Sequence, residues 1–122
     1  MLVATDLDGT LDANPPLFQH VLSALQAAGD EIAVLTGVRA TTVSPADQQA
    51  KRDYLQQLGI TAYSRLVIFP DDGNLPRAKA DWCRRNRVAL LIDNDRANAQ
   101  AAANDCLVLV PWATRTGKKK DG

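Results

Sequence analysis

The sequence predicts an α/β fold in which a parallel five-stranded sheet is covered by helices on both faces. Two observations lead to this prediction. Five short apolar runs recur along the 122 residues, and helix-forming segments with a periodic apolar stripe separate the first four. Each run is continuously apolar rather than alternating, which is typical of strands buried on both faces of a parallel sheet.

The expected elements follow from these runs and from the turn residues between them. Strands are predicted at residues 2–4, 32–35, 66–69, 88–92 and 106–110, with helices at about 17–28, 45–58, 76–86 and 96–103. Asn14 and the prolines after it suit a helix start, and Gly29 suits its end. Ser44 with Asp47 resembles a capping box, and Gly59 ends that helix. Ala50, Tyr54, Leu55 and Leu58 are the expected buried stripe of the second helix.

Composition points to a single globular domain over residues 1–122, with 114–122 as a flexible tail. The formal net charge is zero, which gives no support for nucleic acid as a partner; the basic run Lys118–Lys120 is a frayed tail or a weak anion-binding arm. No run is long enough for a signal peptide or a membrane span. Cys83 and Cys106 lack metal-site spacing, so we expect buried thiols in a reducing cytoplasm.

The segment Asp6-Leu7-Asp8-Gly9-Thr10 follows the first predicted strand. Gly9 allows a sharp turn after the strand that brings Asp6 and Asp8 toward one pocket. Paired carboxylates favour Mg²⁺. The alternative is a strand-ending turn with two solvated aspartates. An EF-hand is excluded because no Glu occurs before Glu31.

Further polar residues follow later strands. Thr36 ends the second predicted strand, and Asp93 ends the fourth. Because right-handed crossovers place the carboxyl ends of parallel strands at one edge, we expect Asp6, Thr36 and Asp93 to converge there. Ligands of open α/β sheets bind at this edge.

In these positions the sequence resembles the haloacid dehalogenase-like (HAD) phosphatase superfamily. Four elements match in order: Asp6 to Thr10, then Thr36, then Lys79 on the helix before the fourth strand, then the acidic cluster Asp93 to Asp95. The match spans about residues 2–110. The resemblance implies a three-layer Rossmann-like HAD fold with strand order 5-4-1-2-3.

The resemblance also implies a Mg²⁺-dependent phosphomonoester hydrolase. Asp6 would be the nucleophile that forms an aspartyl-phosphate, and Asp8 the acid/base. Thr36 and Lys79 would hold the phosphoryl group, and the metal would be bound by Asp6, the Asp8 carbonyl and Asp93. Asn94 and Asp95 are additional candidate metal ligands, and Gly9, Thr10 and Gly37 are candidate phosphate-binding residues.

The chain departs from the family pattern in two ways. Asn94 stands where a second acid is common, and Asp95 is alternatively only a helix cap. The short connections leave no room for a cap domain, so a capless, open site is expected. Such a site suits a large phosphorylated substrate, such as a nucleic-acid end or a protein, or a phosphorylated small molecule enclosed by homo-oligomerisation. The alternatives are a non-catalytic binding or regulatory module on this fold, and a polynucleotide-end phosphatase.

Overall fold

A computed structural model describes residues 1–111 of the chain. In chain order the elements are β1 (Leu2–Asp6), the short 3₁₀ helix η1 (Leu11–Ala13), α1 (Pro15–Ala27), β2 (Glu31–Val38), α2 (Pro45–Leu58), β3 (Arg65–Pro70), α3 (Leu75–Arg85), β4 (Leu90–Ile92), α4 (Arg96–Ala102) and β5 (Leu107–Leu109). The expected tail, residues 114–122 with the basic run Lys118–Lys120, lies outside the described residues.

Within residues 1–111 the strands form one sheet of five, in the order β3-β2-β1-β4-β5. Every neighbouring pair is parallel. Read from the opposite edge, this is the expected order 5-4-1-2-3, so the predicted α/β class and strand order are confirmed. The central strand β1 is flanked by β2 and β4, which places its carboxyl end where the winding direction reverses.

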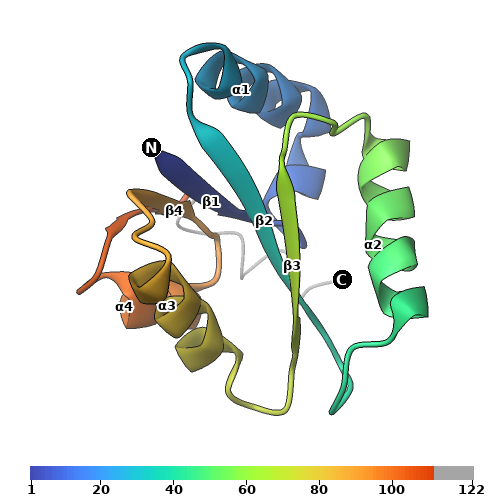
Figure 1. The fold of residues 1–122 in the computed structure, drawn as a ribbon, viewed down its shortest axis with the longest axis vertical. Helices are drawn as coiled ribbons and strands as arrows, with labels where there is room; N and C mark the ends of the chain where they lie inside the picture. Colours follow the sequence, from blue (N-terminus) through green and yellow to red (C-terminus); the bar gives the residue numbers. More distant parts are fainter. Residues whose placement is uncertain (112–122) are drawn as a thin grey trace, which may run out of the picture.

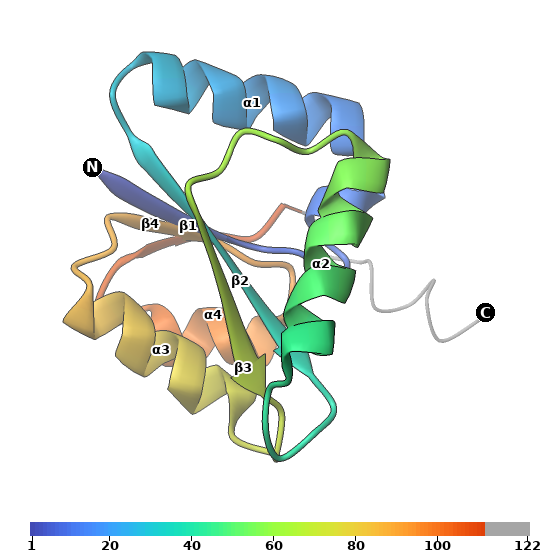
Figure 2. The same cartoon turned by 45° about the vertical axis from the view of Figure 1, so that its right-hand side comes forward.

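The sheet is the middle of three layers (Figure 1; Figure 2). Successive residues of each central strand point to opposite faces, so Val3 and Ile32 pack with α1 and α2, whereas Ala4 and Ala33 pack with α3 and α4. Two apolar cores therefore lie on the two faces of one sheet, and both faces of β1 are covered. This burial explains why the central strands are continuously apolar in sequence.

Local sequence signals set several helix ends as expected. The capping box is present, because Asp47 N donates to Ser44 Oγ at 3.1 Å and Ser44 N donates to Asp47 Oδ2 at 2.8 Å. Gly59 has a φ of 78°, a conformation that glycine adopts without steric cost. Asn14 Oδ1 accepts from Leu17 N at the start of α1.

The strand boundaries differ from the prediction by up to three residues, and the structure explains two of these differences, at the end of β2 and at the start of β4. β2 continues past Thr36, because Gly37 and Val38 still pair with β3. β4 begins at Leu90 rather than at Val88, because Arg87 takes a left-handed φ of 55° and Val88 N donates to Cys83 O, which closes the turn after α3. The ladder can start only after this turn.

The expected stripe of α2 is partly wrong. Leu55 is buried and Tyr54 and Leu58 are half-buried, but Ala50 is exposed, and Lys51 lies on the half-buried face in its place. Positions 51, 54, 55 and 58 share one face of a helix at the i, i+3, i+4, i+7 spacing. The predicted stripe was therefore displaced by one residue at its beginning.

Two further observations bear on the sequence predictions. Cys83 is buried, Cys106 is half-buried, and both are free thiols. Burial raises the pKa of the Cys83 thiol to about 12. Among residues 1–111, no helix is both long and apolar enough to cross a lipid bilayer.

Candidate functional site

The loop after β1 is folded back over the end of its own strand. Gly9 adopts a φ of 82°, and a Cβ atom at this position would lie 2.9 Å from Asn94 Nδ2. Glycine is thus required for the turn and for the close approach of the loop after β4. Thr10 is fully buried, and its Oγ1 lies 3.3 Å from Asp6 Oδ2 and 3.1 Å from Asn94 Oδ1. These contacts join the two loops at the carboxyl edge.

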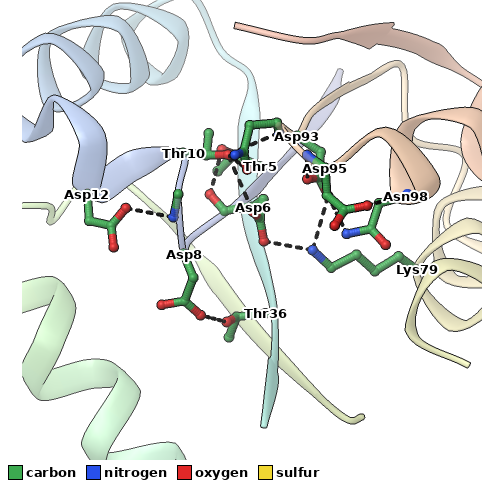
Figure 3. A network of polar contacts seen from close by, with 12 residues as sticks. Thr5, Asp6, Asp8, Thr10, Asp12, Thr36, Lys79, Asp93, Asp95 and Asn98 are labelled. Atoms are coloured by element: carbon green, nitrogen blue, oxygen red, sulfur yellow. Dashed lines mark hydrogen bonds and ion pairs between the residues drawn. The ribbon is translucent and has the colours of Figure 1, made fainter. Parts of the chain in front are cut away.

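An ion-pair network occupies the centre of the site (Figure 3). Lys79 Nζ, on α3, donates to Asp6 Oδ1 at 2.7 Å and to Asp93 Oδ2 at 3.1 Å. The exposed fractions are 1% for Lys79, 7% for Asp6 and 0% for Asp93. One buried ammonium therefore balances two buried carboxylates, and without Lys79 both carboxylates would be buried without a cation, which is costly.

The network changes the ionisation of its members. Burial raises the pKa of Asp6 from 3.8 to about 6, with the Asp93 charge acting in the same direction and Lys79 opposing both. Burial acts to lower the pKa of Lys79, but the neighbouring Asp6 and Asp93 outweigh it and raise that pKa above its usual value. Lys79 is therefore a firmly charged ammonium, whereas Asp6 changes its charge near pH 6.

Asp93 is held in place by the beginning of α4. Asn98 Nδ2 donates to Asp93 Oδ2 at 3.1 Å, and Asp95 N donates to Asp93 Oδ1 at 2.9 Å. Asp95 in turn accepts from Asn98 N at 3.0 Å, which makes it the N-cap of α4. The structure thus gives Asp95 the capping contact that the sequence offered as the alternative to metal binding.

Asp8 points away from this network. Its side chain is 56% exposed, and its Oδ2 atom accepts from Thr36 Oγ1 at 3.2 Å and from Lys51 Nζ at 3.0 Å. Thr36 is buried, so its hydrogen bond holds the exposed Asp8 side chain from the interior side. The two motif aspartates therefore have different environments, one buried against Lys79 and one at the surface beside α2.

A cavity of about 460 Å³ opens at this carboxyl edge. Of the residues expected to form a site, Asp6, Asp8, Gly9, Gly37, Lys79, Asn94 and Asp95 line it. Thr10, Thr36 and Asp93 do not line it but contact those that do. The structure thus brings the expected residues together, while the roles assigned to them stay predictions that the geometry alone does not decide.

Several residues of the site were missed in the sequence. The cavity lining includes Arg39, Asp71, Arg96 and Asn98, and two residues of α2, Lys51 and Tyr54, contact its loops. Lys51 had a detectable signal, because it shares the helical spacing of Tyr54, Leu55 and Leu58. Arg39 follows the end of β2 directly, and Arg96 begins α4, so both could have been placed at the carboxyl edge from the predicted strands.

The described residues do not offer a ready set of ligands for the predicted Mg²⁺ site. Among residues 1–111, no group of three or more His, Cys, Asp or Glu side chains is placed to hold a metal ion. The Lys79 ammonium already lies between Asp6 and Asp93, where a cation bound to both would sit. The described residues therefore do not fit a metal held directly between these two carboxylates, and Mg²⁺ stays a prediction.

Comparison with known proteins gives likeness at the level of structure only. No protein-family model matches the chain, and no curated protein matches it significantly. An uncharacterized protein from Corynebacterium glutamicum superposes with a TM-score of 0.63 at 12% identity, covering 98% of this chain and 90% of that one. A universal stress protein solved in complex with cAMP has a TM-score of 0.53 at 14% identity, covering 92% and 98%. A universal stress family protein from Burkholderia pseudomallei has a TM-score of 0.50 at 16% identity, covering 89% and 95%.

These structures contradict the resemblance to the HAD phosphatases. The two with a family name are universal stress proteins, which are Rossmann-like but belong to a different family. The expected Mg²⁺-dependent phosphatase activity, the aspartyl-phosphate on Asp6 and the polynucleotide-end alternative are therefore wrong. The physical reason is that polar residues at the carboxyl ends of parallel strands are common to many α/β folds, and here Asp6 is bound by Lys79 and Thr10.

Proposed function

We propose that the chain is a non-catalytic binding module for a small anionic ligand, with a mononucleotide as the first candidate. The ligand would occupy the cavity at the carboxyl edge, where β1 lies between β2 and β4. The cavity volume of about 460 Å³ is within the range of small-molecule sites. The universal stress protein solved in complex with cAMP supports a nucleotide as the class to test first.

The observation that carries the proposal is the pair of exposed arginines in the cavity lining. Among the described residues, neither Arg39 nor Arg96 has an ion-pair partner, although both line the cavity. Lys79, in contrast, is already paired with two carboxylates. The arginines are therefore the cations available to a phosphate, which a guanidinium binds through paired N–H donors.

The carboxylates of the lining suit the other groups of a nucleotide. Asp71 and Asp95 each accept a backbone N–H through one oxygen and have further acceptor capacity toward the cavity. Ribose hydroxyls and exocyclic amines are donors that such oxygens can accept. A ligand with an anionic end and several donors thus matches the lining better than a uniformly anionic one.

Calorimetric titration of the purified protein with AMP, cAMP and adenosine tests the proposal. We expect binding of the nucleotides, and recovery of the nucleotide unchanged after incubation. Arg39→Ala and Arg96→Ala should each weaken AMP binding about tenfold, because a hydrogen bond to a charged group contributes roughly 1.5 kcal/mol or more.

Arg52→Ala is the matched control, because Arg52 lies on α2 and lines a separate cavity with Gln49 and Tyr63. It should leave the affinity for AMP unchanged. Absence of any nucleotide binding by the unmodified protein, or equal losses in Arg52→Ala and Arg39→Ala, would contradict the proposal.

A further inference from the structure

An ion pair joins α2 to the edge of the cavity. Lys51 Nζ lies 3.0 Å from Oδ2 of Asp8, which lines the cavity, and no other hydrogen bond of this ammonium is found among residues 1–111. The Lys51 side chain is only 17% exposed, so its stem is packed and its charged end is directed to the cavity edge. An ammonium has three donors, so two remain available there.

A second contact holds the same helix face against the same loop. Tyr54 lies one turn after Lys51, and its hydroxyl donates to Asp12 Oδ2 at 2.7 Å. The other oxygen of Asp12 accepts from Gly9 N at 2.7 Å. The hydrogen bond to Asp12 raises the pKa of Tyr54 to about 12, so the hydroxyl keeps its proton at neutral pH. The helix face that carries Lys51 therefore makes a second contact with this loop, through a neutral hydroxyl.

We propose that Lys51 is a ligand-binding residue whose ammonium transfers from Asp8 to the ligand's phosphate group. This inference rests on the proposed function and assigns it a third phosphate-binding cation. The Asp8 side chain is 56% exposed, so breaking the pair costs little, and rotation at the end of the lysine side chain lets its charge move. Asp8 keeps the hydrogen bond from Thr36 when Lys51 leaves.

The proposal makes predictions of opposite sign for the two partners. Lys51→Ala removes a phosphate-binding charge and should weaken AMP binding about tenfold. Asp8→Asn removes the competing carboxylate, frees Lys51 and should tighten AMP binding severalfold. Adenosine has no phosphate, so neither substitution should alter its affinity. Lys51→Arg should keep most of the AMP affinity.

Tyr54→Phe separates charge from positioning. It breaks the contact with Asp12 but leaves Lys51 in place, so the ratio of AMP to adenosine affinity should stay unchanged even if both affinities fall. Arg52→Ala, next to Lys51 on the outer face of α2, should change neither affinity.

The same titrations distinguish failure of this inference from failure of the proposed function. If the unmodified protein binds AMP, but Lys51→Ala loses adenosine and AMP equally or Asp8→Asn weakens AMP, Lys51 acts only on the structure and the inference is overturned. If the unmodified protein binds no nucleotide, the proposed function is overturned and this inference with it.

Discussion

The amine of Lys79 lies 2.7 Å from Oδ1 of Asp6, although 73 positions separate the two residues in the sequence. The contact joins α3 to the end of the central strand, and a second contact joins α3 to Asp93, the residue directly after β4. Three elements at the carboxyl edge are thus tied by one ammonium. Asp6 and Lys79 of this network line the cavity of the proposed ligand site.

Removal of the Lys79 charge should destabilise the fold strongly. Lys79→Met keeps the length of the side chain but leaves the carboxylates of Asp6 and Asp93 buried without a cation, which typically costs about 3–5 kcal/mol. The loss should be larger at pH 8 than at pH 5, because protonation of the unpaired carboxylates relieves it as the pH falls. Urea denaturation at both pH values measures it.

Arg77→Met is the matched control, because Arg77 is exposed on the same helix. It should change the free energy of unfolding by no more than about 0.5 kcal/mol. A loss in Lys79→Met no larger than that of the control would contradict the importance of the ion-pair network.

Asp6→Asn should stabilise the protein at alkaline pH. The folded-state pKa of Asp6, about 6, lies above its ordinary value of 3.8, so folding favours the protonated form. The free energy of unfolding contributed by Asp6 therefore falls as the pH rises from about 4 to 6, and the cost persists above pH 6. Asn cannot ionise and should recover roughly 1–3 kcal/mol at pH 8, with the difference shrinking toward pH 4. A lower melting temperature than the unmodified protein at pH 8 would reject this account.

Gly9→Ala should cost more stability than Gly59→Ala. Both glycines have positive φ values, 82° and 78°, so each substitution carries a similar backbone penalty of roughly 1–2 kcal/mol. At Gly9 the new Cβ atom would also lie 2.9 Å from Asn94 Nδ2, whereas at Gly59 nothing lies within 4 Å. Thermal melts of the two variants isolate the contribution of the loop contact. Equal losses would show that Asn94 moves aside freely.

Mg²⁺ alone should not stabilise the unmodified protein beyond the effect of NaCl at equal ionic strength. A ligand raises the melting temperature only when it binds the folded state, and here Lys79 already occupies the place between the two buried carboxylates. A saturable rise with MgCl₂ that Asp93→Asn abolishes would instead establish the metal site predicted from the sequence.

The architecture could be predicted from the sequence because the apolar runs and the helix-end residues indicated the same fold. Apolar runs without alternation required a sheet covered on both faces, and Ser44 and Gly59 fixed the ends of α2. The errors are local ones. The extension of β2 past Thr36 depends on pairing with β3, and the late start of β4 depends on the left-handed turn at Arg87. Neither feature produces a periodic pattern of apolar residues that could be recognised in the sequence.

The site was only partly predictable for a different reason. Strand ends placed Asp6, Thr36 and Asp93 at one edge, and the structure brings Lys79 to two of them. Which group a long side chain reaches depends on the packing of its helix. The ion pair between Lys51 and Asp8 therefore could not be predicted from a sequence motif. The resemblance to the HAD phosphatases was wrong because short polar motifs indicate the edge of the sheet, not the chemistry performed there.

Titration of the ¹⁵N-labelled protein with AMP, followed by amide chemical shifts, tests the central claim most directly. The account predicts saturable shifts at the cavity residues Gly9, Gly37 and Asn94, with no change at Thr61 and Tyr63 beside the other cavity. Shifts confined to Thr61 and Tyr63, or no saturable shifts at all, would contradict it.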